Sequence, residues 1–279
     1  MGQQNFCGML PSELERFVRE DLGAMEDDIP PVPEVDAKAA IVAKERCVVS
    51  GVAEAFAILN YFGLEGSGLV PEGEEVAAGR RVMEIRGPAA AILRAERLVL
   101  NFMGRMSGIS TLTRDCAALA GRVRVASTRK TTPGFRSFEK RAVAVGGGDP
   151  HRFDLSSSVM IKDNHLKLMS LEEALAAARR MASFTKKIEV EVEGVTDAVK
   201  AARLGADIIM FDNMRPDEIR AGVELLVREG LRDRVILEAS GGITPETVPE
   251  YAATGVDVIS LGALTRSSPW IDFSLEIEV

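Results

Sequence analysis

Short apolar runs alternate with amphipathic stretches through the second part of the chain. From residue 108 onward the apolar runs occur in VRVAST, SSVMIKDN, KKIEVEVEG, ADIIMFDN, VILEASGG and VDVISLGA. Between them, apolar residues recur with helical spacing in LEEALAAARRMA, TDAVKAARLG, PDEIRAGVELLVREG and TPETVPEYAATG. Apolar strands that alternate with helices are typical of a parallel sheet covered by helices. We therefore predict a TIM-like α/β barrel over residues 108–270, with an open doubly wound sheet as the alternative.

The boundaries of these helices carry ordinary start and stop signals. Ser170, Thr196, Pro216 and Thr244 or Pro245 stand where the helices are expected to begin, and glycine follows three of the helices. Serine and threonine side chains can accept a hydrogen bond from a free N–H of the first turn, and proline is tolerated there. The signals therefore support βα units.

The first part of the chain has a mixed pattern. A helix is predicted over residues 11–23 and in AEAFAILNYFG, strands in AAIVA, CVVSGV and RVMEIRG, and turns in EGSGLVPEGEEVAAG. A long helix is expected to begin at Pro88 and to stop at Gly108. We predict an N-terminal α/β sandwich domain over residues 1–107, to which a C-terminal segment, residues 271–279, returns.

Composition narrows the class of protein. The chain has 279 residues, of which 46% are hydrophobic, and a net charge of −8, which suits a large globular core and argues against general nucleic-acid binding. No apolar run approaches the roughly 20 residues of a membrane helix, and the first residues lack a secretory leader. Cys7, Cys47 and Cys116 have no metal-binding spacing, so we expect reduced thiols and a cytoplasmic location.

Candidate chemistry concentrates between Ser127 and His165, a stretch that contains both histidines of the chain. The wider window from Arg122 to Lys162 carries nine lysines and arginines against three acids, a net charge of +6. Such a concentration of bases in an acidic chain is a footprint for an anion. The bases are mixed with Thr-Thr-Pro-Gly and Gly-Gly-Gly turns, which a solvated helix face would not tolerate. We therefore predict a binding site rather than an exposed basic helix.

Each predicted barrel strand ends in a polar or glycine-rich group. These groups are Thr128-Arg129-Lys130, Lys162-Asp163-Asn164-His165, Glu191, Asp212-Asn213, Glu238-Ala239-Ser240-Gly241-Gly242 and Gly262-Ala263. The carboxyl ends of barrel strands converge on one face, where the chemistry of such folds is built.

The groups differ in character. Five cationic or potentially cationic residues suit a substrate with several carboxylates or phosphates: Arg129, Lys130, His151, Arg152 and Lys162. The acids Glu191 and Asp212 suit Mg²⁺ or ribose hydroxyls, with charge pairing to the same bases as the alternative. The backbone N–H groups of Ser240-Gly241-Gly242 and Gly262-Ala263 suit a phosphate, with plain tight turns as the alternative.

Several motifs, in order along most of the chain, carry a family resemblance. They are Ala95-Glu96-Arg97, Asn101-Phe102 with Ser107-Gly108-Ile109, Thr128-Arg129-Lys130-Thr131, Gly146-Gly147-Gly148 with His151-Arg152, Ile161-Lys162-Asp163-Asn164-His165, Glu189-Val190-Glu191-Val192, Asp212-Asn213, Glu238-Ala239-Ser240-Gly241-Gly242 and Gly262-Ala263-Leu264-Thr265. With these motifs the sequence resembles the quinolinate phosphoribosyltransferases, the decarboxylating enzymes of NAD synthesis. The combination TRKT, GGG, HR and KDNH is a specific signature of that family.

The resemblance implies an N-terminal sandwich, a C-terminal barrel and a head-to-tail homodimer with shared active sites. Arg97 would reach the active site of the partner subunit. The five basic residues named above would contact the pyridine dicarboxylate and pyrophosphate, with Lys130, Lys162, Glu191 and Asp212 as the catalytic group. Glu191 and Asp212 would handle ribose and Mg²⁺, the latter in part through substrate and water. The segments Ser240–Gly242 and Gly262–Ala263 would hold the 5′-phosphate.

Two positions depart from the family pattern. Asp27-Asp28-Ile29-Pro30 stands where relatives usually carry a Gly-Asp-Ile-Thr-like segment, and Arg266 stands where many carry histidine. The first departure concerns an N-terminal loop, and the second concerns details of the phosphate loop. The main signature is unaffected by either.

The implied reaction joins quinolinate to phosphoribosyl pyrophosphate and gives nicotinate mononucleotide, pyrophosphate and CO₂. Three other functions remain open from the residues. A nicotinate phosphoribosyltransferase would need fewer converging bases, because its substrate has one carboxylate. A Schiff-base barrel aldolase would use Lys130 or Lys162 as a nucleophile. A non-catalytic relative would bind anions without turnover.

Overall fold

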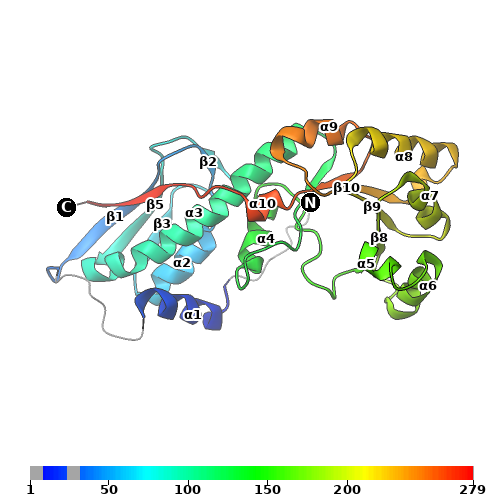
Figure 1. Ribbon diagram of the computed structural model, residues 1–279. Coiled ribbons are helices and arrows are strands. Elements are labelled where there is room, and N and C mark those ends of the chain that lie inside the picture. Colours follow the sequence, from blue (N-terminus) through cyan, green and yellow to red (C-terminus); the bar gives the residue numbers. More distant parts are fainter. Residues whose placement is uncertain (1–8, 24–31, 279) are drawn as a thin grey trace. The chain divides into compact units, whose positions relative to one another are not determined.

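The chain forms two compact units in a computed structural model that describes residues 9–23 and 32–278 (Figure 1). The first unit comprises residues up to Leu112 together with Ser137–Gly146 and the segment from Ser268 onward. The second comprises Thr113–Arg136 and Gly147–Ser267. Cys7 and the departure at 27–30 lie outside the described residues. The units are thus not divided at one point of the chain, since a short middle segment belongs to the first.

The first unit is built on an antiparallel sheet in the order β12-β1-β5-β3. Its strands are β1 (Asp36–Ala43), β3 (Glu65–Gly68), β5 (Arg81–Pro88) and β12 (Phe273–Glu278), and a separate pair consists of β2 (Cys47–Val48) and β4 (Glu75–Val76). The C-terminal strand β12 pairs with β1 from Lys38↔Glu278 to Ala43↔Phe273. The helices are α1 (Pro11–Leu22), α2 (Val52–Tyr61) and α3 (Ala89–Ala120). Helix α2 packs against β3, because Phe56 and Leu59 lie against Gly66.

Two predictions for this unit were wrong in detail. The strand expected in CVVSGV is only Cys47–Val48, and the segment expected to form turns contains β3 and β4. Glycine, proline and glutamate have low strand propensity, so EGSGLVPEGEEVAAG gives no strand signal by itself. Strands β3 and β4 form because they pair with neighbouring strands: β3 pairs with β5, and β4 pairs with β2.

Helix α3 does not stop at Gly108, as the sequence had led us to expect, but continues to Ala120. A Cβ atom at Gly108 would lie 1.8 Å from the carbonyl oxygen of Pro269. The backbone of residues 269–270 therefore crosses α3 at a point where no side chain fits. Gly108 permits a close backbone approach inside a helix, and its role as a helix stop was a misinterpretation.

The second unit contains a parallel sheet in the order β6-β11-β10-β9-β8-β7. The strands are β6 (Arg124–Ala126), β7 (Val159–Ile161), β8 (Ile188–Val192), β9 (Ile208–Asp212), β10 (Ile236–Ser240) and β11 (Val258–Ser260). Strand order follows chain order from β7 to β11, and β11 then pairs with the first strand, β6. A doubly wound sheet would reverse its strand order in the middle. This circular order confirms the predicted α/β barrel, which is open between β6 and β7 in the described part of the chain.

Helices lie around the outside of the parallel strands (Figure 1). They are α5 (Asp163–Leu166), α6 (Leu171–Met181), α7 (Val195–Arg203), α8 (Pro216–Arg228), α9 (Val248–Ala252) and α10 (Ala263–Arg266). Ser170 caps α6, since its Oγ accepts the N–H of Glu173 at 3.2 Å, and Pro216 begins α8. Thr196 is not a cap, because α7 already begins at Val195.

Helix α4 (Arg136–Val145) lies within the basic stretch, where only turns were expected. Lys140 is fully buried, and Arg141 forms ion pairs with Glu54 and with Glu72, the latter at 3.0 Å. All four residues belong to the first unit. The basic stretch is therefore not one site, because these two bases contribute to a core and to an ion-pair cluster.

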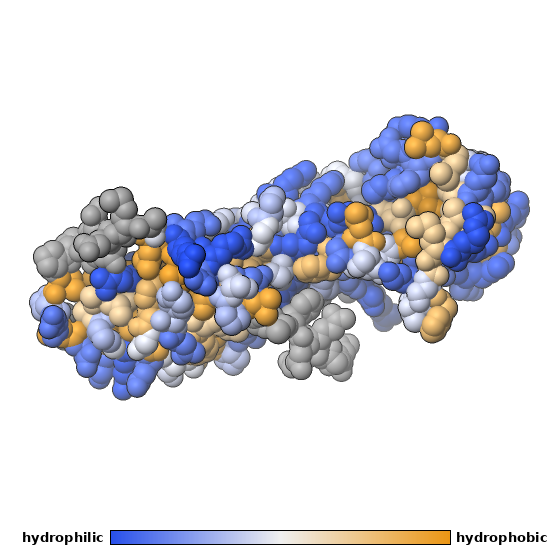
Figure 2. Space-filling view, turned by 90° about the horizontal axis from the view of Figure 1, so that it is seen from below, coloured by the Kyte–Doolittle hydropathy of each residue, from blue (hydrophilic) through white to orange (hydrophobic). Residues whose placement is uncertain are grey.

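The surface is mixed in character. Figure 2 shows hydrophilic residues over most of the viewed face, with smaller hydrophobic groups among them. In the described part of the chain, no helix combines the length and the apolar character needed to cross a membrane.

Candidate active site

A pocket of about 460 Å³ opens at the carboxyl ends of the parallel strands. Many of the residues singled out from the sequence line it: Arg129, Lys130, His151, Arg152, Lys162, Glu191, Asp212, Ser240, Gly241 and Gly242. They come from the ends of β6, β7, β8, β9 and β10 and from the segment after α4. The topology thus brings together side chains that are more than 100 positions apart in sequence.

Three of the singled-out residues do not line the pocket. Arg97 is exposed on α3 in the first unit, where its charge acts on Asp21 of α1. Gly262 lies directly beside the pocket, since a Cβ there would be 3.3 Å from Cδ of Lys130. Ala263 follows it as the first residue of α10. In the same helix, the Thr265 hydroxyl donates to the carbonyl oxygen of Lys130 at 2.7 Å and fixes the backbone there.

The bases at the end of β6 are held by local hydrogen bonds. The N–H of Lys130 donates to the Thr128 hydroxyl at 3.1 Å. Nε of Arg129 is buried without a hydrogen-bond partner among the described residues. A buried donor without a partner has lost its hydration. Arg129 is therefore poised to gain from an acceptor supplied by a ligand.

Lys162 and Glu191 form an ion pair across the ends of β7 and β8. Nζ lies 2.5 Å from Oε1, and the side chains are 41% and 11% exposed. Of the two roles considered for Glu191, charge pairing is the one that the structure shows. An anionic ligand that binds Lys162 has to compete with this carboxylate.

Asp212 is oriented by the turn that follows β9. Nδ2 of Asn213 donates to Oδ2 of Asp212 at 2.9 Å, and the Asn213 N–H donates to the carbonyl oxygen of Ser240 at 2.9 Å. Asn213 adopts a left-handed conformation with φ of 54°. Gly241, with φ of 90°, faces it so closely that a Cβ would lie 2.3 Å from Oδ1 of Asn213. Glycine is thus required at 241 to join the two strand ends.

Two buried acids, Glu189 and Glu238, were given no role of their own from the sequence, although both stand in the motifs named above. Glu189 on β8 is fully buried and Glu238 on β10 is 2% exposed. Burial, together with the charge of Glu238, raises the pKa of Glu189 to about 7. The two-residue period of a strand places Glu189 on the same side as Glu191, so the alternation in IEVEV carried a signal for it.

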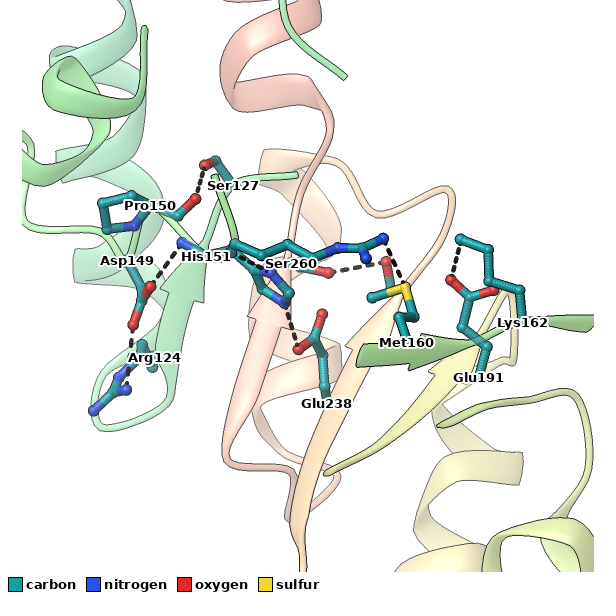
Figure 3. A network of polar contacts seen from close by, with 12 residues as sticks. Arg124, Ser127, Asp149, Pro150, His151, Met160, Lys162, Glu191, Glu238 and Ser260 are labelled. Carbon is teal, nitrogen blue, oxygen red and sulfur yellow. Dashed lines mark hydrogen bonds and ion pairs between the residues drawn. The ribbon is translucent and has the colours of Figure 1, made fainter. Parts of the chain in front are cut away.

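Arg152 extends over these acids. Its Nη2 lies 2.9 Å from Sδ of Met160, and burial lowers its pKa while the charge of Glu189 opposes that shift. Figure 3 shows the ring of His151 directed toward Glu238. Nε2 of His151 lies 3.1 Å from Oε2 of Glu238, and the N–H of Arg152 donates to Nδ1 at 2.8 Å.

His151, Glu189 and Glu238 bring ligand atoms within 4.8 Å of one another, close enough for a metal ion. Both ring nitrogens already have partners, since Nδ1 accepts the N–H of Arg152 and Nε2 lies 3.1 Å from Oε2 of Glu238. A metal ion bound to Nε2 would have to replace the contact with Glu238.

The combination of an α/β barrel with a pocket of arginines and lysines at its strand ends defines an enzyme-like fold that binds a small polyanion. Comparison with known proteins makes the class specific. Residues 30–107 match the N-terminal domain model of the quinolinate phosphoribosyl transferases, and residues 109–276 match the C-terminal domain model. The chain belongs to the quinolinate phosphoribosyl transferase family.

Individual relatives agree with this assignment. The probable nicotinate-nucleotide pyrophosphorylase [carboxylating] of Archaeoglobus fulgidus is 49% identical over 255 residues, 90% of this chain and 98% of that protein. The human nicotinate-nucleotide pyrophosphorylase [carboxylating] is 42% identical over 245 residues, 86% of this chain and 82% of that protein. The structure of the Francisella tularensis enzyme of that name has a TM-score of 0.89 at 31% identity, covering 99% of this chain and 100% of the other. The family and fold class predicted from the sequence are confirmed.

A more distant likeness concerns the alternative function. Human nicotinic acid phosphoribosyltransferase has a TM-score of 0.61 at 14% identity, covering 96% of this chain and 73% of that one. This likeness extends to the fold alone.

Proposed function

We propose that this chain transfers the phosphoribosyl group of phosphoribosyl pyrophosphate to quinolinate and releases pyrophosphate and CO₂, giving nicotinate mononucleotide for NAD synthesis. The observation that carries the proposal is the convergence of Arg129, Lys130, Arg152 and Lys162 in one pocket. Relatives that match over most of this chain are named as carboxylating nicotinate-nucleotide pyrophosphorylases, which is the same reaction written in reverse.

The chemistry needs no side-chain nucleophile. The lone pair of the pyridine nitrogen forms a bond to the anomeric carbon of the ribose, and the bond from that carbon to pyrophosphate breaks with its electron pair on the leaving oxygen. The ring nitrogen is then positively charged. The bond from ring C2 to its carboxylate breaks, CO₂ leaves, and the electron pair on C2, stabilised by the adjacent N⁺, takes up a proton. Positioning and charge stabilisation supply the rate acceleration.

The residue types fit these steps. Arg129 and Arg152 are proposed to bind the two carboxylates, since a guanidinium matches a carboxylate in a bidentate manner. Lys162 is proposed to bind the carboxylates with them, Lys130 to stabilise the departing pyrophosphate, and Asp212 and Glu191 to face the ribose. The backbone N–H groups of Ser240–Gly242 and Gly262–Ala263 are proposed to bind the 5′-phosphate.

A Mg²⁺ requirement is part of the proposal. The metal, when bound, would neutralise charge on the leaving pyrophosphate. Carboxylate oxygens of Glu191 and Asp212 are ligands of the kind that Mg²⁺ prefers, and Glu191 is also engaged by Lys162. We therefore assign most of the metal's contacts to substrate and water, with these carboxylates as its nearest protein groups.

We further propose a homodimer in which Arg97 of one subunit completes the active site of the other. This would use an exposed arginine of α3 that is absent from the lining of the pocket. The partners of the chain would thus be a second copy and two small anions, without nucleic acid or membrane. Reduced, buried Cys47 and Cys116 suit the cytoplasm, where we place the enzyme.

The test is release of labelled CO₂ from quinolinate carrying the label in its C2 carboxylate. Release should require phosphoribosyl pyrophosphate and Mg²⁺ and should match the nicotinate mononucleotide formed. Binding without release would favour the non-catalytic alternative. Against the aldolase alternative, the Lys162 amine is engaged in an ion pair with Glu191, and borohydride should trap no adduct.

A further inference from the structure

We propose that His151 is an uncharged positioning residue, which together with Glu238 holds the backbone that carries Arg152 into the pocket. It would not be a cation that binds the substrate carboxylates. The kinetic part of this inference rests on the proposed function, whereas the state of the ring can be measured without turnover.

The hydrogen bonds of the ring define its protonation. Nδ1 accepts the backbone N–H of Arg152 at 2.8 Å, so it carries no proton. Nε2 then carries the single proton of a neutral ring and donates it to Oε2 of Glu238 at 3.1 Å. Both nitrogens are engaged inside the protein (Figure 3). A substrate carboxylate would therefore find neither a positive charge nor a free N–H on this side chain.

Glu238 provides a rigid anchor for the ring. It lies on β10, which is paired on both sides with β9 and β11, and its side chain is 2% exposed. Its second oxygen, Oε1, has no hydrogen-bond partner among the described residues. A carboxylate buried in this way depends on its remaining partner, so the bond to His151 is costly to break.

The segment held by the ring is bound to the barrel at Asp149, at His151, and at Pro150, whose carbonyl oxygen accepts the Ser127 hydroxyl at 3.0 Å. At Asp149 the backbone pairs with β6: the N–H donates to the carbonyl oxygen of Val125 at 2.8 Å, and the carbonyl oxygen accepts the N–H of Ser127 at 2.9 Å. At His151 the ring connects it to β10. The backbone of His151 itself is left-handed, with a φ of 56°. A non-glycine residue adopts this conformation only when its surroundings hold it there.

Arg152 is the residue that this arrangement aims. It follows the left-handed residue directly, and its guanidinium lies against Met160 on β7. The acids near the ring are Glu238 from β10 and Glu189 from β8, while Asp149 accepts the backbone N–H of His151 and the backbone N–H of Arg152 donates to Nδ1. If the ring is lost, the segment can relax to an ordinary backbone conformation and Arg152 moves away from its position over the pocket.

The first test measures the ring itself by long-range ¹H–¹⁵N correlation NMR of protein labelled in histidine. The chain has only two histidines, and a His165→Gln variant assigns the signals. We expect His151 near neutral pH to show a neutral ring with the proton on Nε2, with and without quinolinate. An imidazolium, a proton on Nδ1, or conversion to imidazolium when quinolinate binds would overturn the proposal.

The second test compares two variants of the anchor. Glu238→Gln keeps an oxygen that accepts the Nε2–H bond, and Glu238→Met removes it at similar volume. We expect Glu238→Met to raise KM for quinolinate about tenfold while KM for phosphoribosyl pyrophosphate changes less than about twofold, and Glu238→Gln to retain most of the quinolinate affinity. Glu193→Gln, an exposed change at the end of β8, is the matched control.

Measuring Tm for each variant distinguishes a loss of positioning from a general loss of stability. A Glu238→Met protein of unchanged Tm with wild-type KM for quinolinate contradicts the positioning role, and so does an equal rise of KM for both substrates. If the wild-type protein releases no CO₂, the proposed function fails, and the NMR result still decides the state of His151.

Discussion

Formal charges cancel within the lining of the pocket: Arg129, Lys130, Arg152 and Lys162 face Asp163, Glu191, Asp212 and Glu238. The +6 of the sequence window therefore does not describe the site. Three of these acids lie on β8, β9 and β10, far from the window, and bases of the window such as Lys140 and Arg141 lie elsewhere. Affinity for an anion must then come from individual pairs with well-placed donors rather than from a net positive field.

At the residue scale, a substitution of Asp212 tests whether this residue acts on the phosphoribosyl group or on quinolinate. Asp212→Asn should lower kcat by at least about tenfold, because a ribose-facing carboxylate acts on charge that develops at the anomeric carbon. The affinity for quinolinate, measured by calorimetry without the second substrate, should change by less than about threefold, because Asp212 is assigned to the ribose. Loss of a direct contact with quinolinate would change the affinity by more than that. If quinolinate binding collapses, Asp212 is a structural partner of the bases.

Substrate choice also belongs to the residue scale. Quinolinate carries two carboxylates and nicotinate one, so nicotinate would leave part of the group Arg129, Arg152 and Lys162 without a partner. A site built around polar partners can reject an analogue that lacks one of them by as much as ~10⁴-fold, and solvent in the cleft reduces this. We expect kcat/KM for nicotinate to be lower than for quinolinate by at least about 10²-fold. Comparable values in steady-state assays would favour the non-decarboxylating alternative.

At the scale of elements, the close approach at Gly108 can be separated from helix propensity. In an unconfined helix interior, alanine is more stabilising than glycine by about 1 kcal/mol. At Gly108 the added Cβ would meet backbone atoms of Pro269 at 1.8 and 2.9 Å, so the sign should reverse. We expect Gly108→Ala to lower the free energy of unfolding by about 3 kcal/mol, measured by denaturant titration.

Gly104 provides the graded comparison for that change. Its nearest neighbour for an added Cβ is the carbonyl oxygen of Ile271 at 2.9 Å, so Gly104→Ala should destabilise by less. If Gly108→Ala instead stabilises the protein, the backbone at Pro269 can move away from α3 at little cost. The glycine would then matter only through its low helix propensity.

The same element explains what the sequence could and could not predict. Barrel strands such as β9 were predictable because their buried faces produce continuous apolar runs. The length of α3 was not, since a glycine that stops a helix and a glycine that admits a crossing chain look identical in sequence. Helix α4 was missed because its polar face meets buried partners instead of solvent, as the ion pair of Arg105 with Glu139 at 2.7 Å shows. Glu189 and Glu238 were named within motifs but were given no role of their own, because burial of an acid in a strand leaves no sequence signal beyond alternation.

At the scale of the whole molecule, the chain is acidic and the formal charges of its pocket lining cancel. A further arginine from a second copy would give the pocket the positive charge that its own lining lacks. Arg97 is suited to this role, because it is exposed on α3. Its positive charge lowers the pKa of Asp21, against the larger effect of burial. The charge balance of the pocket supports the homodimer proposed above.

Subunit complementation tests this assembly. Arg97→Ala and Lys162→Ala should each reduce activity by at least about tenfold, because each removes a cation that meets the substrate. If Arg97 acts across the dimer, a heterodimer of the two variants contains one site with both changes and one with neither. Random exchange at equal concentrations makes half of the dimers mixed, so about a quarter of the wild-type activity should return. Exchange is followed by native mass spectrometry of size-tagged chains, with Arg97→Ala mixed with itself as the control. Mixed dimers without regained activity would place Arg97 outside the partner's site and limit each active site to a single chain.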